Sequence, residues 1–198
     1  MSLEIDVRKL RLFNQMAKEG GGTVADHLQQ MTGLETELYV TKLNFLDRAD
    51  IRTHVGDSKQ IGISIELLEP PHGHILFLFD GQSAKRIAGH MIGGMGEVPD
   101  SGFSELEQSA IQEIGNIMTS AFIDGWANVL DTTIDISTPS ITYGPGSSLV
   151  SNLVHSQYDM ALLFDSQIHA PAADVDLSVY MFPNLEELVH LMRQIELD

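Results

Sequence analysis

A polar stripe lies along one predicted helix, where Ser109, Glu113 and Asn116 stand at positions i, i+4 and i+7. At about 100° per residue, this spacing keeps the three side chains within about 60° of one another. The Asn116 amide offers a hydrogen-bond donor and an acceptor that stay uncharged at any pH, and Glu113 offers a carboxylate. A helix with one buried face also needs polar residues on the other face, so the spacing alone leaves a functional and a purely structural explanation open.

Gly115 and Asn116 are poor choices for a helix interior that is selected for stability alone. An interior glycine costs on the order of 1 kcal/mol relative to alanine, and asparagine is also a weak helix former. A solvated face would instead hold Ala, Lys, Glu or Gln. Because Gly115 lies beside the stripe, we predict that its missing side chain lets the surface of another molecule approach closely.

The stripe needs a helix that is anchored by its opposite face, and the sequence supplies one over residues 105–130. Ser104 and Glu107 form a predicted capping box at its start. Apolar residues then recur on one side, which must be buried: Ile111, Ile114, Met118, Phe122 and Val129. We expect this helix to lie at the outside of the fold with its stripe exposed. An Asn116 buried in the protein's own core would contradict that expectation.

A glycine-rich break at residues 92–103 divides the chain into two halves with similar patterning. Helices are predicted at 7–31 and 105–130, and shorter closing helices at 83–93 and 185–197. Strands are predicted at 35–45, 59–69 and 73–80 in the first half, and at 132–142, 148–156 and 176–183 in the second. At an offset of 98 residues, Met16 aligns with Ile114 and Val24 with Phe122.

This succession predicts an α+β fold. We interpret the chain, 1–198, as a single domain of two pseudo-repeats, at 4–92 and 104–198. Each repeat has a long helix, antiparallel strands and a closing helix, and the two share one core. Helices and strands cluster instead of alternating strictly, which argues against a doubly wound parallel sheet.

The composition narrows the classes of partner. Asp and Glu number 28 against 11 Lys and Arg, for a formal charge of −17, which disfavours nucleic acid and anionic membranes. The acidity fits solubility in a high-salt, halophile-like cytoplasm, and alternatively the steering of a basic partner. The absence of cysteine excludes disulfides and thiolate zinc sites and favours a reducing cytoplasm. His72 and His74 lack a third predicted ligand, so we expect no metal site there.

Residues 109–142 resemble the signature helix and following strand of the CheC/CheX/FliY phosphatases, which act on the phosphorylated chemotaxis regulator CheY. The family pattern is Asp or Ser, three residues, Glu, two residues, Asn, and about 22 residues to a Pro. Here Ser109, Glu113, Asn116 and Pro139 fill it, with 22 residues between the last two. The resemblance is greatest to CheC, which is itself a tandem duplication of about this length.

The resemblance implies that hydrolysis occurs in the regulator's own pocket, where the regulator supplies the phosphoryl group, Mg²⁺ and a lysine. This chain would then need no cofactor of its own. Asn116 would orient the attacking water, and Glu113 would pair with the regulator's lysine. Ser109, Gly115 and Pro139 would belong to the surface that contacts the partner.

The first half departs from the family pattern. Arg11 stands at the Asp/Ser position, Gln15 at the Glu, Lys18 at the Asn and Thr41 at the Pro. A glutamine cannot pair with a lysine as a carboxylate does, and Lys18 would bring a second cation near it. We therefore predict that this first site is inactive. Alternatively, Arg11, Gln15 and Lys18 are simply the solvent-exposed side of a helix and have no function.

Two functions follow from the resemblance. The first is a phosphatase of a phosphorylated CheY-type regulator in chemotaxis. The alternative is a non-enzymatic adaptor that binds a CheD-type receptor deamidase or a component of the motility switch. The intact register of Ser109, Glu113, Asn116 and Pro139 favours the enzyme, since a pure adaptor would be free to lose it.

Overall fold

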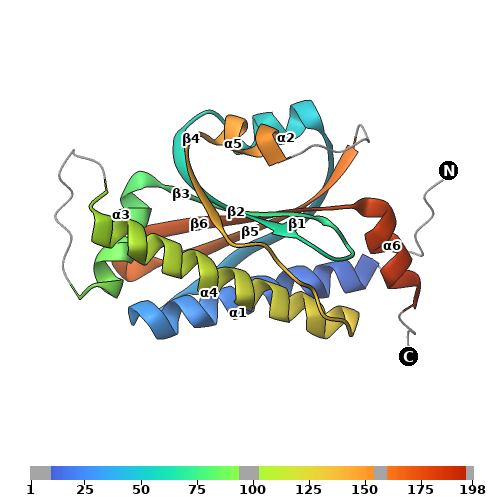
Figure 1. Cartoon of the computed structure of the whole chain (residues 1–198), viewed down its shortest axis with the longest axis horizontal. Helices are drawn as coiled ribbons and strands as arrows, with labels where there is room; N and C mark the ends of the chain where they lie inside the picture. Colours follow the sequence, from blue (N-terminus) through green and yellow to red (C-terminus); the bar gives the residue numbers. More distant parts are fainter. Residues whose placement is uncertain (1–9, 94–102, 154–159, 195–198) are drawn as a thin grey trace.

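A computed structural model describes residues 10–93, 103–153 and 160–194 of the chain. Its six strands form one sheet, and helices cover both of its faces (Figure 1). The first half contains α1 (Leu10–Thr32), β1 (Glu37–Asp47), α2 (Arg48–Val55), β2 (Lys59–Leu67), β3 (Gly73–Asp80) and α3 (Gly81–Met91). The second contains α4 (Glu105–Leu130), β4 (Ser140–Pro145), α5 (Gly146–Leu153), β5 (Met160–Ala170), β6 (Val175–Pro183) and α6 (Leu185–Gln194), with a short 3-10 turn at Pro171–Ala173.

The sheet has the order β1-β5-β6-β3-β2-β4, and every neighbouring pair is antiparallel. Helices and strands follow one another in the same order in both halves. The strands β1, β2 and β3 of the first half correspond to β4, β5 and β6 of the second. The sheet order is symmetric under this exchange, because it then reads the same from the opposite edge. The halves meet at the centre, where β3 pairs with β6, so they share one sheet. The expected α+β class, with antiparallel strands, is confirmed.

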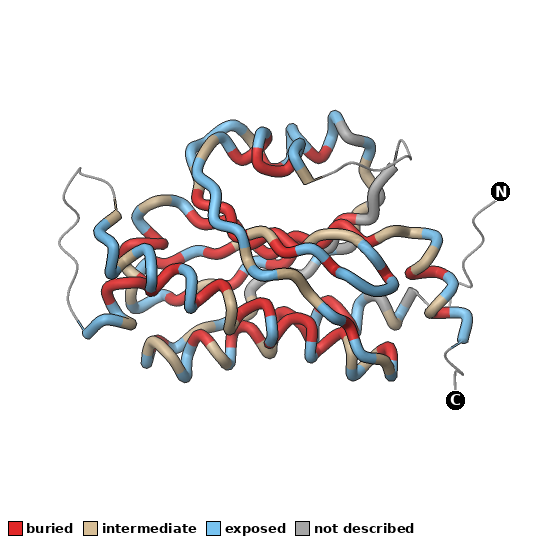
Figure 2. Tube along the Cα trace, viewed as in Figure 1, coloured by how far each residue is buried: buried red, intermediate tan, exposed pale blue. Residues whose placement is uncertain are grey.

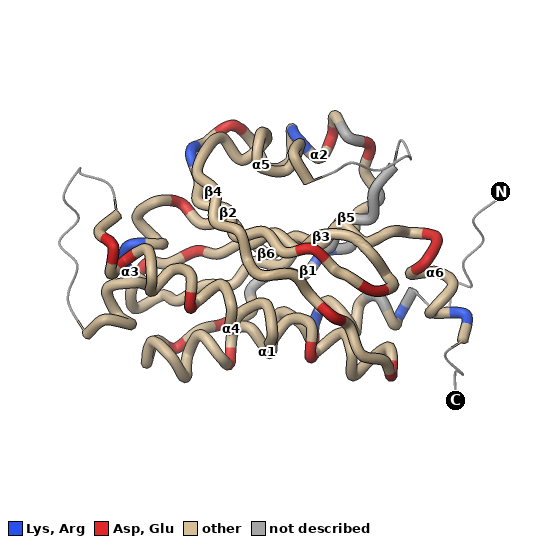
Figure 3. Tube along the Cα trace, viewed as in Figure 1, with Lys and Arg blue, Asp and Glu red and all other residues tan. Residues whose placement is uncertain are grey.

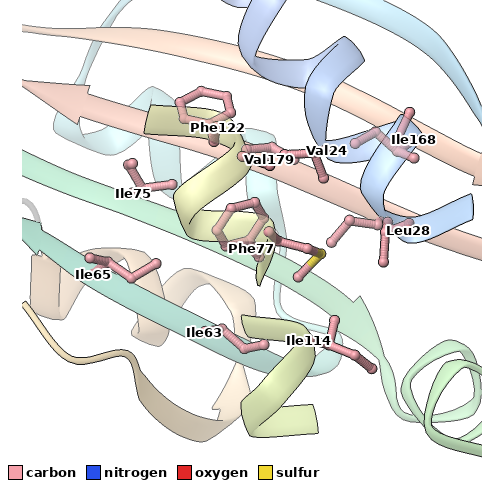
Figure 4. Packing of buried hydrophobic residues seen from close by; sticks show 14 of the residues in the cluster. Val24, Leu28, Ile63, Ile65, Ile75, Phe77, Ile114, Phe122, Ile168 and Val179 are labelled. Carbon is pink, nitrogen blue, oxygen red and sulfur yellow. The ribbon is translucent and has the colours of Figure 1, made fainter. Parts of the chain in front are cut away.

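The main core lies between the sheet and the long helices α1 and α4, which run below the sheet in Figure 1. Phe77 of β3 meets Phe122 of α4 edge to face, and Phe122 stacks on Trp126. Figure 4 shows side chains from α1, α4 and the sheet gathered in this layer. A smaller apolar cluster lies on the opposite face, under α2 and α5. The buried residues in Figure 2 follow these two layers, while the outer sides of the helices are exposed.

Helix α4 begins and ends at the residues that the sequence predicted. The Ser104 side chain accepts a hydrogen bond from the Glu107 backbone, and the Glu107 carboxylate accepts one from the Ser104 N–H at 2.7 Å. The backbone and side-chain hydrogen bonds from Ser104 lower the pKa of Glu107. At the other end, Asp131 takes a left-handed conformation with φ 49° and ends the helix. Both ends of the stripe-bearing helix are therefore fixed locally.

Four sequence predictions about the smaller elements are wrong or incomplete. Residues 148–153, predicted as strand, belong to α5, because Leu149, Val150 and Leu153 share one side of a helix that packs on the sheet. Strand β5 was missed: helices cover both faces of the sheet there, which removes the alternation that marks a strand. Helix α2 was also missed, and the predicted strand at 132–142 begins only at Ser140, apart from an isolated bridge between Leu67 and Ile136. Residues 7–9, 94–102, 154–156 and 195–197 of the predicted elements and break lie outside the described residues.

Candidate functional site

Gly115 faces the protein's own sheet. A Cβ placed on this residue would lie 2.8 Å from Cγ2 of Ile63 in β2, closer than side chains pack. The glycine therefore lets α4 approach β2 within the core. The prediction that Gly115 leaves room for a partner is wrong, because the residue is buried on the inner side of the helix.

The two explanations of Gly115 predict opposite changes in stability on substitution. Gly115→Ala is expected to lower the free energy of unfolding by about 1 kcal/mol, because crowding against Ile63 outweighs the gain in helix propensity. If Gly115 instead only left room for a partner, the same substitution would raise the free energy of unfolding by about 1 kcal/mol. Urea unfolding of the two proteins distinguishes these outcomes.

The polar stripe lies on the outer side of α4 and outside the core, as the sequence predicted. Ser109 and Glu113 are exposed, and Asn116 is half-buried. Asn116 precedes Gly125 by nine residues, which places the two on opposite sides of α4 at 100° per residue. A Cβ on Gly125 would lie 2.7 Å from the backbone nitrogen of Gly20, so Gly125 faces α1. Asn116 therefore points away from α1, towards the edge of the sheet that β4 forms.

The side chains of the stripe are available to another molecule. Among the described residues, Ser109, Glu113 and Asn116 have no hydrogen bond or ion pair that engages their side chains. The Ser120 hydroxyl donates to the backbone carbonyl of Asn116 at 3.1 Å, which leaves the Asn116 amide free. The arrangement thus presents one carboxylate and one neutral amide on a rigid helix.

Pro139 lies directly before β4, on the same side of the fold as the stripe. It separates the isolated bridge at Ile136 from the ladder that starts at Ser140 opposite Ser64. A proline suits this place because it has no N–H to donate to a ladder. Among the described strands β4 pairs with β2 alone, and α4 covers β2, so Pro139 and Asn116 both belong to this edge of the molecule.

The corresponding first-half residues lie on α1 and β1 and are not brought into this site. Arg11, Gln15 and Lys18 are exposed on α1. Thr41 lies in β1, where its backbone is in register with Ser166 of β5. β1 and β4 are opposite edges of the sheet, so Thr41 and Pro139 are separated by its whole width.

Ile141 and Tyr143 of β4 are exposed apolar residues beside the stripe that the sequence analysis did not single out. Their alternation with Ser140, Thr142 and Gly144 is the signal of an edge strand, but the predicted strand ended at residue 142. Neither α4 nor β4 contains a Lys or Arg, whereas acidic residues occur throughout the fold (Figure 3). Within the described ranges, no group of three or more His, Asp or Glu could hold a metal ion, and His72 pairs with Glu187 at 2.8 Å.

Comparison with known proteins places this site in a family. Residues 106–143, which include the stripe, Pro139 and most of β4, match the CheC-like family. The chain is 47% identical over 196 residues to the "Putative CheY-P phosphatase CheC1" of Halobacterium salinarum, covering 98% of this chain and all of that protein. None of the described helices is long and apolar enough to cross a membrane.

Solved structures share the fold at low sequence identity. Thermotoga maritima FliY matches with a TM-score of 0.76 and 17% identity over 97% of both chains. The FliM middle domain of H. pylori matches with a TM-score of 0.70 and 9% identity over 96% of this chain and all of that one. Vibrio vulnificus CheX matches with a TM-score of 0.61 and 15% identity over 84% of this chain and 97% of that one. Given the 47% identity across nearly its whole length, this chain belongs to the CheC-like family.

Proposed function

We propose that this protein accelerates hydrolysis of the aspartyl phosphate on a CheY-type response regulator in chemotaxis signalling, acting in the cytoplasm. The observation that supports this most is the pair of the exposed Glu113 and the half-buried Asn116, whose side chains are unengaged, on a helix otherwise built into the core. The pair lies inside the segment that matches the CheC-like family. The 47%-identical relative carries CheY-P phosphatase in its name.

In this proposal Asn116 enters the regulator's pocket and orients a water molecule in line with the phosphorus atom. The water oxygen bonds to phosphorus, the bond to the aspartyl oxygen breaks, and inorganic phosphate leaves with the proton passing to phosphate or solvent. The regulator supplies Mg²⁺, and Glu113 pairs with its lysine. Positioning of this kind is the main contribution a protein makes to phosphoryl transfer.

The fold supports such positioning because α4 is rigidly held. Its N-terminus is capped by Ser104, its inner face packs on β2 at Gly115, and its flank packs on α1 at Gly125. A side chain presented by a helix that is held at one end and on two sides is placed more accurately than one on a loop. The half-burial of Asn116 further restricts its rotamers.

The adaptor function remains the second candidate. The fold is shared with one chain of a FliG–FliM complex of H. pylori at 13% identity, which shows common architecture only. An adaptor for a CheD-type protein or the motility switch would not need an unengaged Glu113 and Asn116. Retention of both residues therefore favours the phosphatase.

The decay of a CheY-type regulator phosphorylated with acetyl phosphate, with and without this protein, tests the proposal. The wild-type protein is expected to accelerate decay. Glu113→Ala is expected to raise the half-saturating concentration and lower the rate, because it removes a charge-assisted contact. Gln15→Ala, at the corresponding first-half position, is the matched control and should behave as wild type. Unchanged decay at saturating wild-type protein, with binding still measurable, would support the adaptor instead.

A further inference from the structure

Large apolar side chains are exposed around the polar stripe. The described chain has five such exposed residues, and three of them lie here: Leu106, Ile141 and Tyr143. We propose that these three form an apolar docking surface, which supplies most of the affinity for the phosphorylated regulator. The proposal rests on the proposed function and adds to it the residues that select the partner.

The strand register places two of these residues beside α4. Ile141 pairs with Ile63, and Tyr143 pairs with Ile61. Directly paired residues of antiparallel strands point to the same face of the sheet. Ile63 is the residue against which Gly115 packs, so this face is the one that α4 covers. Ile141 and Tyr143 therefore project along the open side of α4, and they are 40% and 63% exposed.

Leu106 extends the surface along the helix. It is 61% exposed in the first turn of α4, three residues before Ser109 and seven before Glu113. These separations put it on the same face of the helix as the stripe. The polar pair is thus bordered by apolar side chains from α4 at its start and from β4 along its flank.

The charge of this surface fits a receiver domain whose pocket presents a lysine. Glu113 is the only charged residue among the stripe and the three apolar residues, and no Lys or Arg occurs between positions 87 and 192. A partner lysine therefore meets a carboxylate with no competing Lys or Arg from α4 or β4, which both lie between those positions. Apolar contacts add affinity that salt does not screen, which matters for a chain with a formal charge of −17.

The apolar residues of the docking surface should affect binding of the regulator, whereas Asn116 should affect the hydrolysis step. Contacts made by Ile141 and Tyr143 are the same before and during hydrolysis, so they contribute uniform binding. Their loss raises the half-saturating concentration and leaves the maximal rate unchanged. Loss of Asn116 lowers the maximal rate, because its contact is to the reacting water.

The test measures regulator decay over a range of protein concentrations for wild type, Tyr143→Ser and the double variant with Ile141→Ser. We expect the half-saturating concentration to rise about tenfold for Tyr143→Ser and further for the double variant, at an unchanged maximal rate. Leu68→Ser removes another apolar residue, 50% exposed but beyond the end of β2, and should match wild type. Equal half-saturating concentrations for all four proteins would overturn the docking surface while the proposed function stands.

Binding to the regulator activated with beryllofluoride, followed by calorimetry, separates the two proposals. If wild type binds the activated regulator and the double variant does not, the docking surface is supported. This holds even if wild type leaves the rate of decay unchanged, a result that would overturn only the proposed phosphatase activity. Absence of both binding and acceleration by wild type would overturn both proposals. Sedimentation of each variant provides a further check: if the double variant converts a wild-type dimer to a monomer, the surface joins two copies of this chain and the proposal is wrong.

Discussion

Asn116→Ala is expected to remove most of the hydrolysis that the protein adds, with a loss of about 100-fold in the maximal rate. The substitution deletes the amide that orients water and leaves the packed face of α4 intact. Alanine is also the better helix former, so the free energy of unfolding should rise slightly. The loss of activity would then occur in a protein at least as stable as wild type.

Lys18→Ala is the matched comparison, because Lys18 occupies the corresponding position on α1 and also lies outside the core. It should leave the rate of regulator decay nearly unchanged in the same assay. Thermal unfolding of both variants excludes loss of fold as the cause. Equal losses for the two variants, or a larger loss for Lys18→Ala, would move the working site away from α4.

Gly125→Ala is expected to lower the free energy of unfolding by about 2 kcal/mol, since it forces two helices apart. The added Cβ would lie 2.7 Å from the Gly20 nitrogen and 2.8 Å from the carbonyl carbon of Glu19. Both atoms are backbone, so no side chain can rotate aside. In a chain of this size the change corresponds to a fall of about 4–8 °C in Tm.

Gly22→Ala is the control for the general effect of removing a helical glycine. Gly22 lies inside α1, and a Cβ there would meet nothing within 4 Å. This variant should gain about 1 kcal/mol from helix propensity. Urea unfolding should therefore give changes of opposite sign for the two glycines. A stabilised Gly125→Ala would show that α1 and α4 do not cross as closely as described.

The sequence by itself determined the long helix of the second half and the residues on its exposed side. The capping box at Ser104 and the apolar recurrence from Ile111 to Phe122 are local signals, since neighbours along the chain produce them. They predicted the bounds of α4, the exposure of Ser109 and Glu113, and the position of Asn116 outside the core. The loss of all four signature residues in the first half was equally visible without a structure.

The tertiary structure decided the features that depend on contacts between distant segments. Gly115 was explained from the sequence by a partner, whereas the structure explains it by Ile63, a residue 52 positions earlier that pairing within the sheet brings under α4. Strand β5 lost its alternation because helices cover both faces of the sheet, which local patterning does not reveal. The exposure of Ile141 and Tyr143 followed only from the position of β4 at the edge of the sheet. The periodicity of a helix depends on residues that are close together in the sequence. Strand order and close helix contacts instead depend on packing between residues that are far apart in the sequence.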